Sequence, residues 1–267
     1  MARAKRHFIP NLVWHITHRC HKKAFLLKFS RDKKRWLHWL FQAKKKYGLS
    51  ILNFSLTSNH IHLLVYDRGK RNVIPDSLLL VASRTAQEYN KRKIRSGAFW
   101  EDRYHATAVE TGQHLMKCMV YIDLNMVRTG KVKHPEEWPY CGYNEIMSYR
   151  QRYKLLDYKS LIRLLGIKTT EDLRVLYKKW IEEAIDIGKL KRESRWTESI
   201  AVGSKSYLEN INKQLGFRSR GRRILKDEGV LELREMRHPY SSNFISNKVH
   251  HDNPYFLVCR LYIFSIK

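Results

Sequence analysis

Acidic residues are scarce in this chain. Its 267 residues include 25 Asp and Glu against 52 Lys and Arg, which gives a formal net charge of +27. An excess of this size indicates a polyanionic partner, a nucleic acid in preference to an anionic membrane surface. It argues against an ordinary metabolic enzyme that acts on a small neutral substrate.

Cysteines and long apolar runs are also few. The 4 cysteines are scattered, with no C-x-x-C pair, so neither a disulfide framework nor a zinc ribbon is indicated. The longest uncharged apolar runs, such as residues 59–66, are far shorter than the roughly 20 residues that a membrane span needs. No secretory apolar region follows the basic residues 1–10. We therefore expect a cytoplasmic, nucleoid-associated protein that does not bind membranes.

Strand and helix patterns alternate through the first half of the chain. Alternating apolar residues predict strands at residues 12–17, 51–57, 60–66 and 104–109. Helical periodicity predicts helices at residues 31–47, 75–89 and 114–128. Only Ser58 and Asn59 separate the second and third strands, which predicts a tight hairpin. This order matches the split βαβ pattern, so we expect an α+β fold with a ferredoxin-like antiparallel sheet and helices on one face.

Strand patterns fade after residue 135. Helices are predicted at residues 158–165, 171–187 and 205–215, followed by a basic loop at residues 217–223. We expect a domain at residues 1–150, a basic helical extension at residues 151–237 that contacts DNA, and a tail at residues 238–267 with no assigned structure. The arginines of the basic loop are candidates for phosphate contact, with a solvated charge run as the alternative. They are Arg218, Arg220, Arg222 and Arg223.

His60-Ile61-His62 lies within the predicted strand 60–66. Side chains of a strand alternate between its faces, so both imidazoles point to the same side. Such a pair can hold one metal ion from a rigid platform. The chain has 13 histidines, so a chance H-x-H match is common. On this motif alone, surface histidines beside a nucleic acid are the simpler interpretation.

The predicted helix 114–128 carries a second group of candidate residues. Its apolar stripe consists of Leu115, Met119, Ile122 and Met126. At about 100° per residue, Tyr121 and Asn125 lie together on another face. That face also carries His114, Lys117, Cys118 and Arg128. A purely structural helix does not need a tyrosine there, but an interface tyrosine with its hydroxyl in water remains an alternative.

Four separate motifs favour a functional role for these histidines and this tyrosine over the simpler alternatives. They are residues 58–65 (SNHIHLLV), 99–105 (FWEDRYH), 121–130 (YIDLNMVRTG) and 137–140 (EWPY). In their order and distances the chain resembles the REP-associated tyrosine transposases, a branch of the single-tyrosine HUH transposase superfamily (HUH stands for histidine, hydrophobic residue, histidine). The resemblance covers roughly residues 5–150. One departure is Met126, where the family often has Pro, and we expect it to affect how the helix ends rather than the chemistry.

The resemblance implies a role for each matching residue. His60 and His62 match the pair that holds a divalent metal, Mg²⁺ or Mn²⁺, Tyr121 matches the nucleophile, and Asn125 completes the metal site. The implied activity is a metal-dependent tyrosine transposase that cleaves and rejoins single-stranded DNA at hairpin or repeat sequences through a 5′-phosphotyrosine intermediate. The implied partner is single-stranded or hairpin DNA, and a homodimer is one possible assembly. Lys117 and His114 are the nearby candidates to stabilise the phenolate or relay its proton.

Two rival functions stay open. One is an HUH nicking enzyme of the replication-initiator or relaxase type. The other is a domesticated protein that binds structured nucleic acid without cutting it, against which the presence of both histidines, the tyrosine and the asparagine argues.

Other aromatic and basic residues are candidates for DNA contact. Lys117 and Arg128 lie on the predicted helix face, and four aromatic residues interleaved with basic ones could stack unpaired bases. These are Trp100, Tyr104, Trp138 and Tyr140. Anchoring of loops is the simpler role for each of them singly. A further group, His15, His18, Cys20 and His21, suggests zinc, but side chains diverge at a strand end, which favours surface or nucleic-acid contact.

Overall fold

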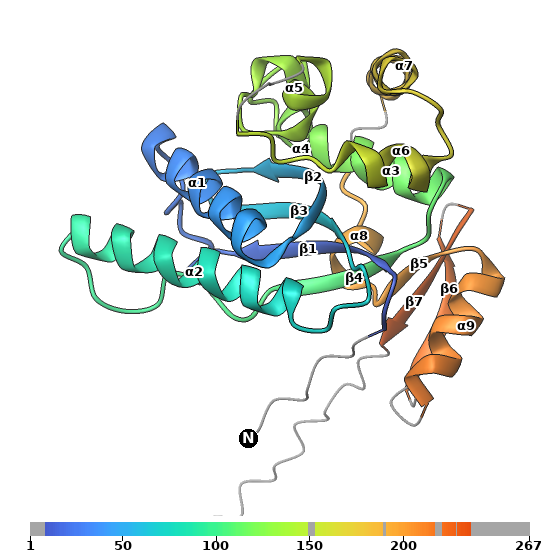
Figure 1. Ribbon diagram of the computed structural model, residues 1–267, viewed down its shortest axis with the longest axis horizontal. Helices are drawn as coiled ribbons and strands as arrows, with labels where there is room; N and C mark the ends of the chain where they lie inside the picture. The colour runs from blue at the N-terminus through green and yellow to red at the C-terminus, as the bar shows by residue number, and fades with distance from the viewer. Residues whose placement is uncertain (1–8, 149–152, 189–190, 217–220, 228, 236–267) are drawn as a thin grey trace, which may run out of the picture. The chain divides into compact units, whose positions relative to one another are not determined.

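A seven-stranded sheet with the order β2-β3-β1-β4-β5-β7-β6 organises the chain (Figure 1). The computed structural model describes residues 9–148, 153–188, 191–216, 221–227 and 229–235. The strands are β1 (Val13–Arg19), β2 (Ser50–Leu56), β3 (His60–Tyr66), β4 (His105–Val109), β5 (Ala201–Gly203), β6 (Arg222–Asp227) and β7 (Val230–Glu235).

The first four strands form the predicted ferredoxin-like sheet. β1 pairs antiparallel with both β3 and β4, and β2 pairs antiparallel with β3. The turn between β2 and β3 is closed by the Thr57 N–H, which donates to the His60 carbonyl at 3.0 Å. Each predicted strand lies within two residues of the observed one.

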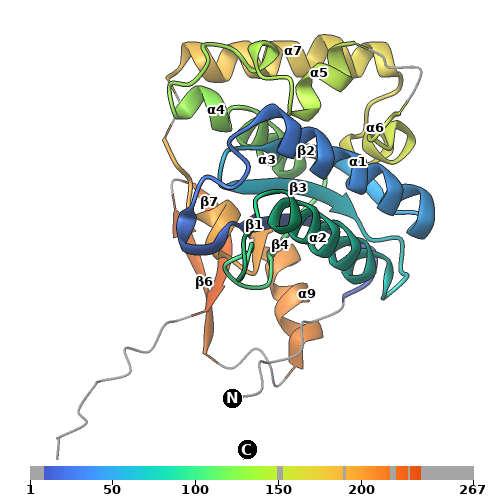
Figure 2. The same cartoon turned by 90° about the vertical axis from the view of Figure 1, so that its left-hand side faces the viewer.

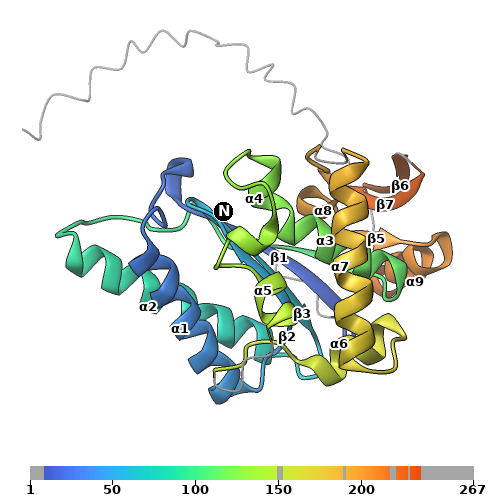
Figure 3. The same ribbon diagram turned by 90° about the horizontal axis from the view of Figure 1, so that it is seen from above.

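Helices α1 (Ser30–Tyr47) and α2 (Val73–Arg92) pack side by side on one face of this sheet (Figure 3). In α1 the buried residues Trp36, Leu40 and Ala43 recur at helical spacing, and the helix ends at Gly48 in the left-handed conformation, with φ 72°. α2 begins two residues before Pro75, at Val73. Both helices therefore follow the periodicity seen in the sequence.

The opposite face of the sheet is covered by helices as well. It carries α3 (Gln113–Asp123), α4 (Asn125–Arg128) and α8 (Arg195–Glu198) (Figure 3). The Asn53 side chain on β2 donates to the Met119 carbonyl of α3 at 3.3 Å, which joins the helix to the sheet. The predicted helix 114–128 is interrupted at Leu124. Its predicted apolar stripe is buried as expected: Leu115, Met119, Ile122 and Met126.

Residues after 150 add both helices and strands. The remaining helices are η1 (His21–Lys23), η2 (Pro135–Glu137), α5 (Gly142–Met147), α6 (Tyr158–Leu165), α7 (Thr170–Asp186) and α9 (Lys205–Leu215). Three of them, α6, α7 and α9, confirm the predicted helices of the extension. β5 pairs in parallel with β4, β7 continues the sheet, and α9 packs on β5 and β7 (Figure 2). The first 150 residues and the extension therefore share one sheet.

The predicted basic loop needs a correction. Arg222 and Arg223 begin strand β6, where they pair with Glu235 and Arg234. Arg218 and Arg220 lie outside the described residues, as does the tail 238–267. Within the described residues, no helix is long and apolar enough to cross a membrane.

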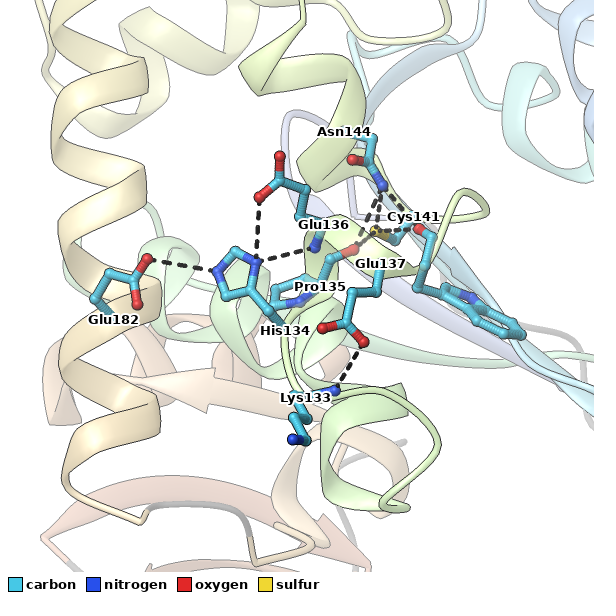
Figure 4. Close-up of polar contacts among 9 residues, drawn as sticks. Lys133, His134, Pro135, Glu136, Glu137, Cys141, Asn144 and Glu182 are labelled. Atoms are coloured by element: carbon cyan, nitrogen blue, oxygen red, sulfur yellow. Dashed lines mark hydrogen bonds and ion pairs between the residues drawn. The ribbon is translucent and has the colours of Figure 1, made fainter.

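The segment between α4 and α5 holds α7 in place (Figure 4). The His134 ring lies between the carboxylates of Glu136, at 3.8 Å, and Glu182 of α7, at 3.5 Å. The Asn144 amide donates to the Trp138 carbonyl at 2.8 Å, which fixes the start of α5 against the same segment. The contact between His134 and Glu182 connects the first 150 residues to the extension at a second place besides the sheet.

A buried polar cluster lies between α3, α7 and β2. The Asp123 carboxyl accepts hydrogen bonds from the Tyr177 hydroxyl and, at 3.0 Å, from the Asn53 amide. Burial raises the pKa of Asp123 from 3.8 to about 7, although both hydrogen bonds favour the charged form. Ionisation of this carboxyl should therefore contribute to the pH dependence of folding.

Asp123 should make the free energy of unfolding fall as pH rises from about 4 to about 7, because the native state holds its proton over that range and the unfolded chain does not. The buried His15 and His60 act in the opposite direction, because their lowered pKa values let the unfolded chain bind protons that the native state does not. Asp123→Asn, which cannot ionise, isolates the contribution of Asp123: the free energy of unfolding of the wild type minus that of the variant should fall by a few kcal/mol, in order of magnitude, over this range. Urea unfolding followed by circular dichroism, with EDTA present, measures this difference, and a difference that stays constant with pH would contradict the prediction.

Candidate functional site

β3 places His60 and His62 on the face of the sheet that α3 and α4 cover. Ile61 and Leu63 alternate with them and are buried on the α1–α2 side, as strand periodicity predicts. The two imidazole rings lie 5.0 Å apart, centroid to centroid. The side chain of His62 is almost completely buried, while His60 is partly exposed at the start of the strand.

The break at Leu124 brings Asn125 and Tyr121 to these histidines. The Asn125 Nδ2 lies 2.8 Å from the Nε2 of His62. The Tyr121 ring lies edge-on to the His62 ring with 6.0 Å between centroids. All four residues proposed for the site from the sequence therefore meet at one place, although β3 and α4 are about sixty residues apart in the chain.

Tyr121 is more enclosed than the helix face predicted. Its side chain is only 5% exposed. The Arg128 guanidinium lies 4.0 Å above its ring and donates to the Tyr121 carbonyl at 2.8 Å, and the Trp196 ring of α8 lies 6.1 Å away. Among the described residues the Tyr121 hydroxyl has no hydrogen-bond partner. The ring of Tyr121 is therefore part of the packed interior.

Burial and cations set the protonation of the site. Burial raises the pKa of Tyr121, while the positive charges of Arg128 and Arg192 oppose the rise. Burial, together with Arg19, lowers the pKa of His60 to about 4, and burial brings that of His62 well below its ordinary value. Near neutral pH both imidazoles are therefore uncharged, as metal ligands must be.

The donor atoms fit a divalent cation. The His60 Nδ1 is occupied by the Thr57 hydroxyl at 2.9 Å and by the Asn59 amide oxygen at 2.7 Å, which leaves Nε2 for a ligand. The His62 Nε2 faces the Asn125 amide, whose oxygen reaches the same point after a 180° turn. The described residues contain no group of three His, Cys, Asp or Glu that could hold a metal, so the amide is needed as the third ligand. Two imidazoles and one amide oxygen suit Mn²⁺ or Mg²⁺, with oxygen ligands from water or phosphate completing the shell.

His15 on β1 is a component that the sequence did not reveal. The sequence favoured surface or nucleic-acid contact for it, but the side chain is fully buried. Its Nε2 lies 2.9 Å from the His62 Nδ1, and its Nδ1 lies 2.8 Å from the Trp196 carbonyl oxygen. The signal is the register between β1 and β3, which places Thr17 opposite His62 and so makes His15 its diagonal neighbour.

Two residues proposed as proton or charge carriers lie elsewhere. The Nδ1 of His114 lies 3.2 Å from a carboxylate oxygen of Glu110. Lys117 is exposed on the outer side of α3. The cation over the phenol ring is Arg128, which was proposed only for DNA contact.

The predicted aromatic residues serve mainly as anchors. Trp100 stacks on His18 with 4.1 Å between ring centroids and donates to the Ala82 carbonyl at 3.1 Å. Trp138 donates to the Leu56 carbonyl at 2.9 Å, and the Tyr140 hydroxyl donates to Ser30 at 2.6 Å. These contacts favour the loop-anchoring interpretation over base stacking for these three residues.

Fold and site together define a class of protein: a ferredoxin-like domain in which a His-x-His strand faces a buried tyrosine on α3 and an amide on α4. Residues 8–125 match the family model described as "Transposase IS200 like". Over this segment, which is less than half of the 267 residues, the chain is similar to the IS200-like transposases. The match includes His60, His62, Tyr121 and Asn125, and it ends before Arg128 and Trp196.

Two solved structures are similar to the chain. One is a REP-associated tyrosine transposase bound to a REP hairpin, with 15% identity, a TM-score of 0.46, and coverage of 59% of this chain and 94% of that chain. The other is a putative transposase from Deinococcus radiodurans R1, with 15% identity, a TM-score of 0.32, and coverage of 43% and 91%. No curated protein matches the chain. At this level of similarity neither structure informs the chemistry of the site.

Proposed function

We propose that this protein is a metal-dependent single-tyrosine transposase of the REP-associated branch, which cleaves and rejoins single-stranded DNA at hairpin-forming repeats. The observation that carries the proposal is the convergence of Tyr121, His62 and Asn125, with His60 beside them, inside a segment similar to the IS200-like transposases. Acting on DNA, the protein would work at the nucleoid.

The proposed reaction is a phosphoryl transfer to the phenol. The Tyr121 oxygen forms a bond to the scissile phosphorus, and the bond from phosphorus to the 3′ oxygen breaks. The phenolic proton leaves to solvent, the departing 3′ oxygen takes up a proton, and the 5′ phosphate stays on Tyr121. A divalent cation held by His60, His62 and Asn125 would neutralise the phosphate charge and stabilise the transition state. Because the covalent link conserves the bond energy, rejoining needs no ATP.

Arginines from three parts of the chain support binding of an anionic phosphate. Arg19 at the end of β1, Arg128 of α4 and Arg192 of the extension all lie close enough to His60 to lower its pKa. Arg19 and Arg192 are exposed, so both can meet a DNA backbone. The uncharged imidazoles and these cations together make a site suited to a phosphodiester.

A cleavage assay on single-stranded DNA tests the proposal. We expect the wild-type protein with Mn²⁺ or Mg²⁺ to cut a hairpin-bearing oligonucleotide beside the hairpin and to join the product to a second repeat. A relaxase-like enzyme would nick without joining repeats, and a domesticated binder would retain the hairpin without cutting it. Either result would contradict the proposal.

Replacing Arg128 by Gln should slow cleavage at neutral pH by about tenfold, because less of the Tyr121 phenol is then ionised. The guanidinium over the ring opposes the effect of burial on the pKa of Tyr121, so its removal lets that pKa rise further. The alkaline rise of the rate against pH should therefore move to higher pH. Single-turnover cleavage measured from pH 6 to 10 checks this.

Arg128→Lys is the control for this effect. Lysine keeps the positive charge but cannot reproduce the bond from the guanidinium to the Tyr121 carbonyl. We expect the Lys variant to keep most of the wild-type pH profile. Equal shifts in both variants would show that Arg128 acts by holding the backbone.

A further inference from the structure

A buried chain of hydrogen bonds connects the C-terminal extension to the metal-binding histidine. The Trp196 carbonyl oxygen of α8 lies 2.8 Å from the Nδ1 of His15, and the Nε2 of His15 lies 2.9 Å from the Nδ1 of His62. The His62 Nε2 ends the chain at Asn125, at 2.8 Å. The two rings are stacked, with an interplanar angle of 15°.

The donor and the acceptor of each hydrogen bond in this series can be assigned in one way only. A carbonyl oxygen accepts and cannot donate, so the His15 Nδ1 must carry the proton of the bond to Trp196. His15 is fully buried, and burial favours the neutral form of an imidazole. A neutral His15 has only one N–H, so its Nε2 accepts and the His62 Nδ1 donates. The His62 Nε2 therefore keeps its lone pair, which faces the Asn125 amide.

Strand β4 holds the segment that carries the Trp196 carbonyl in place. The Thr107 hydroxyl on β4 donates to the Ser199 carbonyl at 2.7 Å and lies 3.3 Å from the Trp196 carbonyl. The Ala108 N–H donates to the Ile200 carbonyl at 2.8 Å, next to the first residue of β5. The Trp196 side chain is buried against Tyr121. The acceptor that orders the chain is therefore part of the sheet and packed core.

We propose that His15 is a positioning residue: anchored by the Trp196 carbonyl, it fixes His62 in the Nδ1–H tautomer and directs the Nε2 lone pair of His62 to the metal. That His62 binds a metal rests on the proposed function. The tautomer of His62 does not, because it follows from the hydrogen bonds alone. The extension thus completes the site from outside the segment 8–125 that the transposase family model covers. A hydrogen bond to the second nitrogen of a ligating histidine typically changes metal affinity 10–100-fold.

The tautomer is measured directly by nitrogen-15 NMR of histidine-labelled, metal-free protein. In the wild type we expect His62 with its proton on Nδ1 and an unprotonated Nε2. In His15→Leu, which has neither donor nor acceptor, His62 should change to a mixture of tautomers or to Nε2–H. In His15→Gln the amide oxygen can accept from His62, so the wild-type tautomer should return. His18→Leu removes a histidine from the same strand whose ring stacks on Trp100 instead, and it should leave His62 unchanged.

Mn²⁺ affinity, measured by water-proton relaxation, provides the second measurement. It should fall about 10–100-fold in His15→Leu, recover in large part in His15→Gln, and stay at the wild-type value in His18→Leu. Circular dichroism of each variant identifies any that does not fold.

The outcomes separate this proposal from the proposed function. A wild-type His62 protonated on Nε2 would overturn the proposal without any variant, as would a His15→Leu protein that is folded and keeps both the tautomer and the Mn²⁺ affinity. If the wild type shows the Nδ1–H tautomer but neither binds Mn²⁺ nor cleaves DNA, the hydrogen-bond chain stands and the proposed function fails.

Discussion

Tyr121→Phe is expected to form no covalent adduct with hairpin DNA and to lose cleavage by roughly a thousandfold or more, because the substitution removes the attacking oxygen. DNA binding should stay near the wild-type level, since the hydroxyl has no hydrogen-bond partner among the described residues and the ring with its Arg128 and Trp196 contacts is retained. Denaturing gel electrophoresis of protein incubated with end-labelled DNA measures the adduct, and gel shift measures binding.

The label also tests the direction of the reaction. The tyrosine retains the 5′ phosphate, so the wild-type protein should carry the DNA segment on the 3′ side of the cut. Tyr140→Phe is the matched control, because its hydroxyl bonds Ser30 at 2.6 Å on the loop after η2, away from the histidines. A normal adduct with Tyr121→Phe would assign the nucleophile to another residue, and an adduct with the opposite segment would reverse the polarity.

The ferredoxin-like part of the fold could be predicted because local periodicity in the sequence shows its helices and strands. Trp36, Leu40 and Ala43 recur on one side of α1, and Gly48 ends it. Ser58 and Asn59 leave room only for a hairpin between β2 and β3. Four strands with two intervening helices then allow few arrangements, and the antiparallel order follows.

The added strands could not be predicted in the same way. β5 has three residues, Ala201–Gly203, too few to show alternation, and it is a strand because β4 offers a free edge for parallel pairing. In β6, Arg222 and Arg223 suggested a solvated loop, yet they pair with β7. Strand formation at such sites depends on the neighbouring strand rather than on local sequence.

The candidate site likewise has a part that local sequence patterns predict and a part that depends on contacts distant in the sequence. The alternation of β3 placed His60 and His62 on one face, and helical spacing placed Tyr121 with Asn125. The burial of Tyr121 depends on Trp196, which follows it by more than seventy residues, and no local pattern shows that contact. His15 was likewise misplaced on the surface, because its contact with His62 follows from strand register and not from spacing in the chain.

His60→Ala and the double variant with His62→Ala are expected to lose metal-dependent cleavage by about a thousandfold or more, comparable to loss of the central catalytic groups of other enzymes. In the double variant Asn125 is the only proposed metal ligand left, and a single amide does not hold a divalent cation. In His60→Ala one of the two imidazole ligands is missing, which should weaken metal binding. Mn²⁺ binding should disappear together with cleavage. Hairpin binding should largely survive, because exposed cations such as Arg19 and Arg192 remain.

His134→Ala is the matched control for this prediction, since His134 is held between Glu136 and Glu182 on the segment before α5 (Figure 4). It should keep both Mn²⁺ binding and cleavage. Wild-type protein in EDTA should behave like the double histidine variant, because both lack the cation that neutralises the scissile phosphate. If the double variant cuts DNA at the wild-type rate in EDTA, the two histidines do not serve a metal, and the cations around Tyr121 must stabilise the transition state alone.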